Sequence, residues 1–287
     1  MSERRSPEEW ALHINLILDT AFGRERHPVS VVEVARMFSA IKYPSEPIMV
    51  VEGGELPGFQ GALIRHPNRG WGIVYNRNVL SKRRIRFTLA HEFGHYLMHR
   101  SFRPTGFQCV AEEIPNPEQP FDRLEREADT FASHFLIPPH DLVEQIPPTE
   151  WTDLNMLGCC ADRYGVSLLA LIRQWLRLTQ QRAALVVSRE GCILWSEASE
   201  TAKKCGACFR ESWKEPVEIP AQSLAAQRHA TNHPKDGILV SKGAWFQEHD
   251  VVEMAVYADQ YDFIISLLML DFDQQATTPD TRSSFDC

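Results

Sequence analysis

Residues 82–99 read KRRIRFTLAHEFGHYLMH, and within them His91, Glu92 and His95 form the motif H-E-x-x-H. Apolar residues recur through this stretch at the spacing of one helical face, so a helix is predicted, with Ser81 as its N-cap. Residues four positions apart lie on the same face of a helix, so the two histidines can bind one metal ion. Glu92, one step around the helix, can then reach a water in the open coordination position. This arrangement is typical of zinc metallopeptidases; the alternative is a pair of core histidines satisfied by hydrogen bonds.

A zinc site of this kind needs a third protein ligand, and residues 121–137 supply the candidates. The stretch has the apolar spacing of a second helix, which a proline pair ends. Glu125 is the predicted metal ligand, and Asp129 is predicted to accept the free ring N–H of a ligating histidine. Glu127 is the rival ligand, but it points roughly 200° away from Glu125 around the helix. The alternative is that Glu125 and Asp129 are only solvated charges.

Other histidines fit the metal site less well. A metzincin would need glycine and histidine at positions 98 and 101, where this chain has methionine and serine, so that class is excluded. His99 continues the face of His95 about one turn beyond the metal, and we interpret it as structural or as a support for a ligand. His134 and His140 can reach the edge of the cleft, but nothing in their spacing requires it.

Two separated motifs in the chain resemble those of a known family. The first is RFTLAHEFGHYLMH at residues 86–99, and the second is EREADTFA at residues 125–132, followed by Leu-Ile-Pro. The segments GALIR at 61–65 and GIVYN at 72–76 resemble the strands that lead into that family's active-site helix. Agreement in order and kind makes this stretch similar to the ImmA/IrrE-type metallopeptidases over about residues 30–180.

The resemblance implies a zinc-dependent endopeptidase of the gluzincin type, with His91, His95 and Glu125 as ligands of Zn²⁺ and Glu92 as the base. Asp129 stands where the family has asparagine or aspartate. The resemblance also implies a role in bacterial regulation, in which a protein substrate such as a helix-turn-helix repressor or an antitoxin-like protein is cut. It fades after about residue 180.

In the predicted mechanism, zinc acidifies its bound water, and Glu92 takes the proton and later gives it to the leaving amine. An additional hydrogen-bond donor to the oxyanion is expected, and the candidates are Tyr96, His134 and Tyr164. Two other functions stay open. The chain could be a zinc-containing regulator that binds a repressor without cutting it, or a DNA-binding protein that uses residues 153–180.

Composition agrees with a cytoplasmic globular protein. The chain has 287 residues, of which 44% are hydrophobic, enough to bury a substantial core. The N-terminal residues lack the apolar core of a signal peptide, and no apolar run approaches the ~20 residues of a membrane span. A net charge of −8 argues against a whole-protein nucleic-acid binder. Direct nucleic-acid binding and membrane association are therefore not expected.

The expected fold class is α+β. It comprises a mainly helical metallopeptidase domain with a small antiparallel sheet, followed by a smaller α+β domain. The expected division is residues 1–150 for the zincin-like metallopeptidase domain, 151–182 for a helix pair, 183–271 for the C-terminal domain and 272–287 for a disordered tail. The C-terminal domain is interpreted as a candidate sensory module of the GAF-like kind, without recognisable site residues.

The metallopeptidase domain should begin with two helices, capped by Ser6 and Ser30. Strands are predicted at 48–52, 60–65 and 71–76, and the edge of their sheet is a hypothetical site for an extended substrate. Residues 104–121 contain four prolines and almost no periodicity, so they are predicted to be a loop.

The helix pair resembles a helix-turn-helix, with Gly165 in the turn and Ser167 capping the second helix. Its strongly apolar second helix favours packing over DNA binding. The polar contacts that this helix offers are Arg173, Gln174 and Arg177.

The seven cysteines are odd in number and irregularly spaced, which argues for reduced thiols. Cys205 and Cys208 form a lone C-x-x-C. With Cys192 and either His229 or His233 they are a weak candidate for a second zinc site, against which ordinary thiols are the favoured interpretation.

Overall fold

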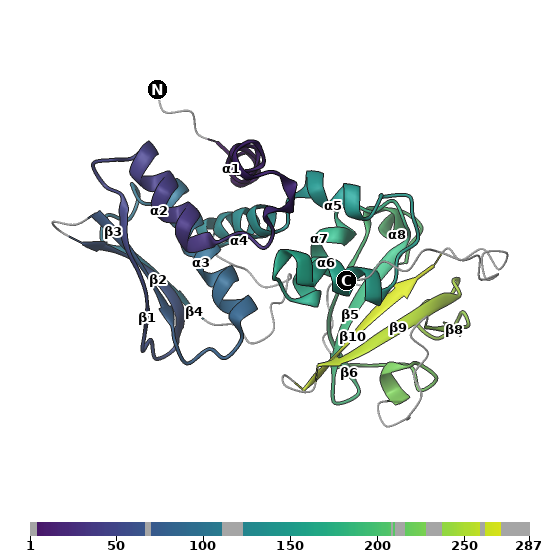
Figure 1. Cartoon of the computed structure of the whole chain (residues 1–287). Helices are drawn as coiled ribbons and strands as arrows, with labels where there is room; N and C mark the ends of the chain where they lie inside the picture. The colour runs from purple at the N-terminus through teal and green to yellow at the C-terminus, as the bar shows by residue number, and fades with distance from the viewer. Residues whose placement is uncertain are drawn as a thin grey trace. The chain divides into compact units, whose positions relative to one another are not determined.

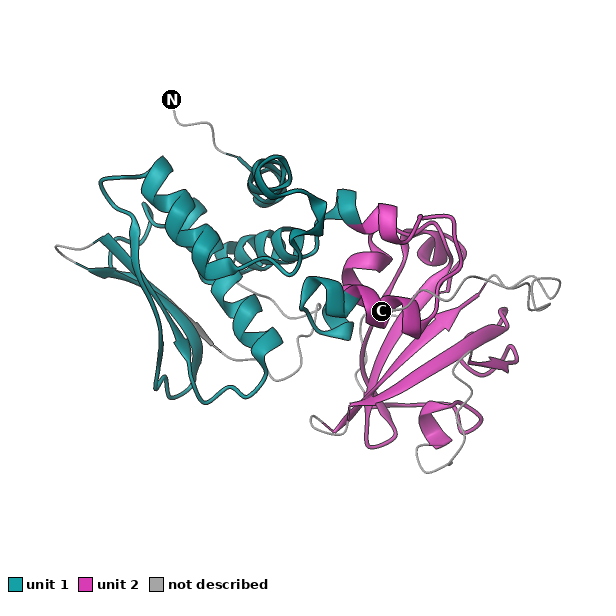
Figure 2. Cartoon of the chain, in the orientation of Figure 1, with its two compact units in different colours: residues 1–115, 119–141, 161–170 teal, residues 116–118, 142–160, 171–287 magenta. Residues whose placement is uncertain are grey.

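The computed structural model describes residues 5–66, 70–110, 123–207, 209, 216–227, 237–258 and 262–270. The chain divides into two compact units, which Figure 2 colours separately. Both units combine helices with a sheet, so the predicted α+β fold class is confirmed. The N-terminal unit comprises residues 1–115, 119–141 and 161–170, and the C-terminal unit comprises residues 116–118, 142–160 and 171–287.

The predicted helix caps of the N-terminal unit are confirmed. Ser6 and Glu9 form a capping box, in which the Ser6 hydroxyl accepts from the Glu9 N–H at 3.2 Å and the Glu9 carboxylate accepts from the Ser6 N–H at 2.7 Å. Ser30 and Ser81 cap the next two α-helices through their hydroxyls. The α-helices, labelled in Figure 1, are α1 (Pro7–Phe22), α2 (Val31–Lys42), α3 (Lys82–Met98) and α4 (Arg123–Leu136), and the 3-10 helix η1 (Arg24–Arg26) follows α1.

The sheet of this unit is mixed rather than antiparallel. Its strand order is β1-β3-β2-β4, in which β2 runs antiparallel to β3 and β4 while β1 runs parallel to β3. The three predicted strands are present, but β3 inserts between β1 and β2, so β1 and β2 do not pair, whereas the consecutive strands β2 and β3 pair antiparallel. The strands are β1 (Ile48–Gly54), β2 (Phe59–His66), β3 (Gly70–Asn76) and β4 (Gly106–Val110).

Strand β4 lies where the sequence predicted only a loop at 104–121. The strand begins at Gly106, whose φ is +116° and where an added Cβ would lie 2.0 Å from the Leu63 carbonyl oxygen. Only glycine permits that approach of β4 to β2. The strand is short and adjoins a proline-rich stretch, so it has no detectable periodicity; residues 111–122 of the predicted loop lie outside the described residues.

Helix α3 lies against β2 and β3 on one side and α4 on the other. The two helices approach closely at Gly94, where an added Cβ would lie 3.0 Å from the Phe131 ring and 3.3 Å from the Ala128 Cα. Ala128 and Ala132 are fully buried. The small side chains of α4 therefore allow α3 and α4 to approach each other closely.

Three further helices follow α4. The turn of the predicted helix pair is confirmed: Gly165 has a φ of +63°, and the Ser167 hydroxyl accepts from the Ala170 N–H at 3.1 Å. Residues 161–170 of this pair belong to the N-terminal unit, and its other residues belong to the C-terminal unit. The helices are α5 (Pro139–Gln145), α6 (Leu154–Tyr164) and α7 (Leu168–Leu176).

The C-terminal unit contains an antiparallel sheet with the strand order β7-β6-β5-β10-β9-β8. The β5–β6 hairpin turns at Glu190 and Gly191, which both have positive φ. The predicted tail at 272–287 lies outside the described residues. The elements are β5 (Ala183–Arg189), β6 (Cys192–Ala198), α8 (Glu200–Lys204), β7 (Val217–Glu218), η2 (Ala225–Gln227), β8 (Ile238–Val240), β9 (Val251–Ala258) and β10 (Phe263–Met269).

The cysteines follow the predicted thiol state only in part. Cys192 and Cys205 are free thiols, whereas Cys159 is disulfide-bonded, so the expectation of reduced thiols is wrong at that position. Cys208, together with the histidines of the candidate second zinc site, lies outside the described residues. Within the part of the chain that is described, every helix is too short or too polar to cross a membrane.

Candidate metal centre

Two imidazoles of α3 and one carboxylate of α4 converge on one point. His91 Nε2 lies 3.0 Å from His95 Nε2, and the Glu125 oxygens lie 3.1 Å from His91 Nε2 and 3.4 Å from His95 Nε2. Among the described residues, this is the only group of at least three His, Cys, Asp or Glu side chains whose ligand atoms all lie within 4.8 Å of one another. The structure thus brings together the three residues that the sequence predicted as metal ligands.

The donor atoms of this group fit a metal ion. His91 Nδ1 lies 2.8 Å from the Asp129 carboxylate and donates its proton there, so His91 Nε2 presents a lone pair to His95 and Glu125. Acceptor atoms that face one another repel unless a cation lies between them. The separations of 3.0, 3.1 and 3.4 Å are also close to the roughly 3.3–3.5 Å edge of a tetrahedral site with metal–ligand bonds of about 2.0–2.1 Å.

The protonation states of the group also suit metal binding. Burial lowers the pKa of His95 to about 4, so its imidazole is neutral at neutral pH. Burial alone would raise the pKa of Glu125, but the adjacent His91 and His95 side chains outweigh it and hold that pKa well below its usual range. Metal ligands must be deprotonated, and these two groups are.

Asp129 occupies the position that supports His91. It stands one helical turn after Glu125 on α4, and its carboxylate is partly exposed while the imidazole that it contacts is buried. The 2.8 Å contact fixes both the orientation of the ring and the nitrogen that carries the proton. The structure therefore places Asp129 where the sequence predicted a hydrogen-bond acceptor for a ligating histidine.

Glu92 is fully buried between α3 and β2. It adjoins Gly61 of β2, where an added Cβ would lie 2.8 Å from Glu92 Oε1 and 2.4 Å from the Thr88 methyl group. The strand therefore needs glycine at this position to leave room for the carboxylate. No feature of the sequence alone marked Gly61, because the contact joins residues that are 31 positions apart in the chain.

Glu127, the rival ligand, does not belong to the converging group. Its carboxylate lies 2.9 Å from His99 Nε2, and His99 Nδ1 lies 2.9 Å from His95 Nδ1. His99 is almost fully buried. The sequence left the role of His99 open and gave no sign that Glu127 would lie beside it.

Comparison with known proteins agrees with this geometry. Residues 48–175 match the family model described as Peptidase_M78, IrrE N-terminal-like domain. This segment is similar to an IrrE N-terminal-like domain. The predicted resemblance to the ImmA/IrrE family is thereby confirmed, and the match includes all of α3 and α4.

The chain also resembles a solved structure over a longer stretch than the IrrE-like segment. A Mycobacterium tuberculosis transcriptional regulator superposes with a TM-score of 0.50 and 12% sequence identity, over 91% of this chain and 75% of that chain. At this identity the likeness concerns the fold alone. No curated protein matches the sequence.

The predicted candidates for an oxyanion donor in the IrrE-like domain are engaged elsewhere. The Tyr96 hydroxyl donates to the Glu46 carbonyl oxygen at 3.0 Å, and the Tyr164 hydroxyl donates to Asp141 at 2.6 Å. His134 Nδ1 lies 2.9 Å from the Thr130 carbonyl oxygen. These contacts favour none of the three for that role.

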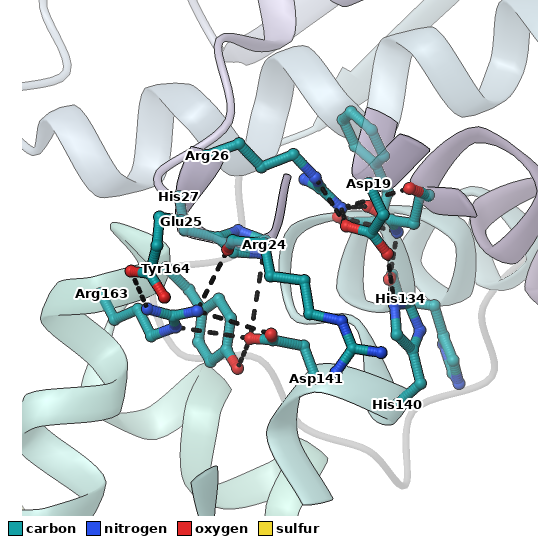
Figure 3. Close-up of polar contacts among 12 residues, drawn as sticks. Asp19, Arg24, Glu25, Arg26, His27, His134, His140, Asp141, Arg163 and Tyr164 are labelled. Carbon is teal, nitrogen blue, oxygen red and sulfur yellow. Dashed lines mark hydrogen bonds and ion pairs between the residues drawn. The ribbon is translucent and has the colours of Figure 1, made fainter. Parts of the chain in front are cut away.

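A second polar cluster in the N-terminal unit, which we name the Asp141 cluster, is drawn in Figure 3. The buried Asp141 carboxylate accepts from the Tyr164 hydroxyl at 2.6 Å and from two Arg163 nitrogens at 3.4 Å. His27 Nε2 lies 3.9 Å from the same carboxylate. The rest of the cluster is Asp19, which pairs with both Arg26 and His140, and Glu25, which pairs with Arg163. His140 therefore lies here rather than at the metal centre.

The arginines available for a DNA-binding role of the helix pair face a carboxylate. Arg173 donates to Glu197 at 2.8 Å, and Arg177 lies 3.9 Å from the same side chain. Arg173 also lies over the Trp195 ring at 5.7 Å. These contacts within the C-terminal unit favour a packing role for α7.

Proposed function

We propose that the chain is a zinc-dependent endopeptidase of bacterial regulation, acting in the cytoplasm on a protein substrate. The observation that supports this most strongly is the convergence of His91, His95 and Glu125 beside the buried Glu92. Two nitrogens and one oxygen suit Zn²⁺, and three protein ligands leave one position open, as in catalytic rather than structural zinc sites.

Each residue of the site has a distinct part in the proposed reaction. Zn²⁺, when bound, would act as a Lewis acid and lower the pKa of a coordinated water toward ~7. Glu92 accepts the proton of the attacking water and later delivers it to the leaving amine. Asp129 holds the His91 ring in the orientation that directs Nε2 toward Glu125. Burial of Glu92 excludes bulk water, so its proton goes to the reacting groups rather than to solvent.

The proposed substrate is a helix-turn-helix repressor or an antitoxin-like protein. Membership of residues 48–175 in the IrrE N-terminal-like family supports a regulatory role, and the structural neighbour described as a transcriptional regulator is compatible with it. Strand β4 lies at one edge of the sheet, so an extended peptide could pair with it as a further strand.

The test compares new protein N-termini in host cells that express wild-type protein or the Glu92→Gln variant. We expect a small set of cuts with wild type only, because glutamine cannot accept the proton, and loss of about 10²–10⁴-fold in cleavage of the identified substrate. Zinc content should be equal in both proteins.

Cleavage retained by Glu92→Gln would contradict the mechanism. An absence of cuts with both proteins folded and zinc-loaded would instead favour a regulator that binds a repressor without cutting it. Pull-down of the same repressor by wild type and by Glu92→Gln would then identify that second function.

A further inference from the structure

Three side chains form a hydrogen-bonded chain behind the metal centre. His95 Nδ1 lies 2.9 Å from His99 Nδ1, and His99 Nε2 lies 2.9 Å from the Glu127 carboxylate. His95 and His99 stand one turn apart on α3, while Glu127 comes from α4. The chain therefore leads from a predicted metal ligand, through a buried imidazole, to a carboxylate on the neighbouring helix.

The chemistry of the ring nitrogens fixes every proton along this chain. An imidazole that binds a metal through Nε2 carries its proton on Nδ1, so His95 Nδ1 must donate to His99 Nδ1. His99 Nδ1 then accepts, which leaves the His99 proton on Nε2, where it faces the Glu127 carboxylate. One tautomer of each histidine satisfies all of these contacts at once, and it is the tautomer that leaves His95 Nε2 free to bind a metal.

Packing holds the chain in place. His95 is fully buried and stacks on the Phe107 ring of β4 at a centroid distance of 4.3 Å and an interplanar angle of 18°. His99 is 1% exposed. Arg123 donates to the Glu127 carboxylate at 2.7 Å, one turn earlier on α4. Phe107 fixes the plane of the His95 ring, and His99 fixes its rotation within that plane.

We infer that His99 and Glu127 are positioning residues, which together hold His95 in the orientation and tautomer that bind the metal ion. The inference rests on the proposed metal centre. Asp129 supports His91 by one direct contact, whereas Glu127 supports His95 through an intervening histidine. His95 Nδ1, which contacts an imidazole rather than a carboxylate, thus obtains the same support in two steps.

The test measures the zinc dissociation constant of the full chain by competition with a chromophoric chelator. His99→Phe keeps a ring of similar size without hydrogen bonds, and Glu127→Met keeps the length without an acceptor. Each should weaken zinc binding by about 10–100-fold, the range found when such supporting contacts are removed. The double variant should be no weaker than His99→Phe alone, because the two residues act in series.

Conservative variants separate positioning from packing. His99→Gln supplies both an acceptor and a donor, and Glu127→Gln keeps an acceptor, so both should recover most of the lost affinity. Arg126→Gln should leave zinc affinity unchanged, since this exposed arginine of α4 is not one of the three residues of the hydrogen-bonded chain. Circular dichroism and thermal unfolding of the zinc-free variants establish that each one is folded.

The tautomer of His99 distinguishes a hydrogen-bonding role from a packing role, because packing alone does not determine which ring nitrogen carries the proton. In the ¹⁵N spectrum of the histidine rings of the zinc-loaded protein, His99 should carry its proton on Nε2. A proton on Nδ1, or unchanged zinc affinity in both His99→Phe and Glu127→Met, would overturn the inference.

The same measurements keep this inference distinct from the proposed function. If His95→Ala binds zinc as wild type does, the metal centre itself is wrong and the inference fails with it. If zinc affinities behave as expected but Glu92→Gln still cleaves, the positioning role stands and the proposed peptidase mechanism fails.

Discussion

The metal centre and the Asp141 cluster both join histidines to carboxylates inside the N-terminal unit, yet they balance charge in opposite ways. In the Asp141 cluster, Arg163 pairs with Asp141 and Arg26 pairs with Asp19, so the cations come from the chain itself (Figure 3). At the metal centre, the nearest partners of Glu125 are two imidazoles whose nitrogens face each other at 3.0 Å. Arginine already balances the charge of the carboxylates in the Asp141 cluster. At the metal centre the converging lone pairs repel one another unless a metal ion lies between them.

Removal of one of the converging ligand nitrogens should have the largest effect on zinc binding and cleavage, and it tests most directly whether only the metal centre binds zinc. His95→Ala is expected to reduce bound zinc from about one equivalent per chain to near none, together with all cleavage, because two protein ligands hold Zn²⁺ poorly. Metal content after dialysis measures this. His140→Ala in the other cluster is the matched control and should retain zinc; zinc loss there would show that the two clusters are not independent.

Removal of the central acid of the other cluster should affect stability instead. Asp141→Ala removes the acceptor of the buried Tyr164 hydroxyl and the buried carboxylate that pairs with the Arg163 guanidinium. We expect the free energy of unfolding to fall by about 3–5 kcal/mol, as for other broken buried pairs. Urea unfolding followed by tryptophan fluorescence measures it, with zinc affinity of the folded variant unchanged. A loss below about 1 kcal/mol would mean that the cluster contributes little.

Acid should lower the free energy of unfolding of the metal-free protein through His27 of the Asp141 cluster. Burial is the main cause that lowers the pKa of His27 from 6.5 to about 4, with Arg26 adding to it and Asp141 opposing it. Between these pH values the unfolded state binds more protons than the folded state, so stability falls as pH falls from about 6.5 to about 4. The loss is at most about 3.5 kcal/mol for one such histidine, at about 1.4 kcal/mol for each pKa unit.

The pH effect can be assigned to one cluster by substitution. His27→Leu should show a shallower fall in the free energy of unfolding than wild type between pH 7 and pH 4.5, with a chelator present. A slope identical to that of wild type would mean that His27 is not the titrating group.

The smallest effects are expected from two glycines. Gly61→Ala would place a methyl group against Glu92 and Thr88, so cleavage should fall while zinc affinity stays close to that of wild type. Gly158→Ala in α6 meets nothing within 4 Å and should stabilise the protein by about 0.5–1 kcal/mol. Kinetics with the identified substrate and thermal unfolding test the pair. Normal cleavage by Gly61→Ala would show that β2 does not set the position of Glu92.

Local signals accounted for much of the fold. The structure confirms the predicted helix caps at Ser6, Ser30 and Ser81, which depend on residues close in sequence. The parallel pairing of β1 with β3 and the presence of β4 were not predicted. Pairing order depends on which strands meet in space, and β4 is a strand only because β2 lies next to it.

The sequence alone was enough to predict that His91 and His95 lie together, because a spacing of four residues puts them on one helical face whatever surrounds the helix. It also identified the helix that carries Glu125 and Asp129. Only the tertiary structure decided how those groups are supported: that Gly61 leaves room for Glu92, and that His99 and Glu127 lie behind His95. Helical periodicity is a property of one segment, whereas these contacts arise where α3 packs against α4 and β2.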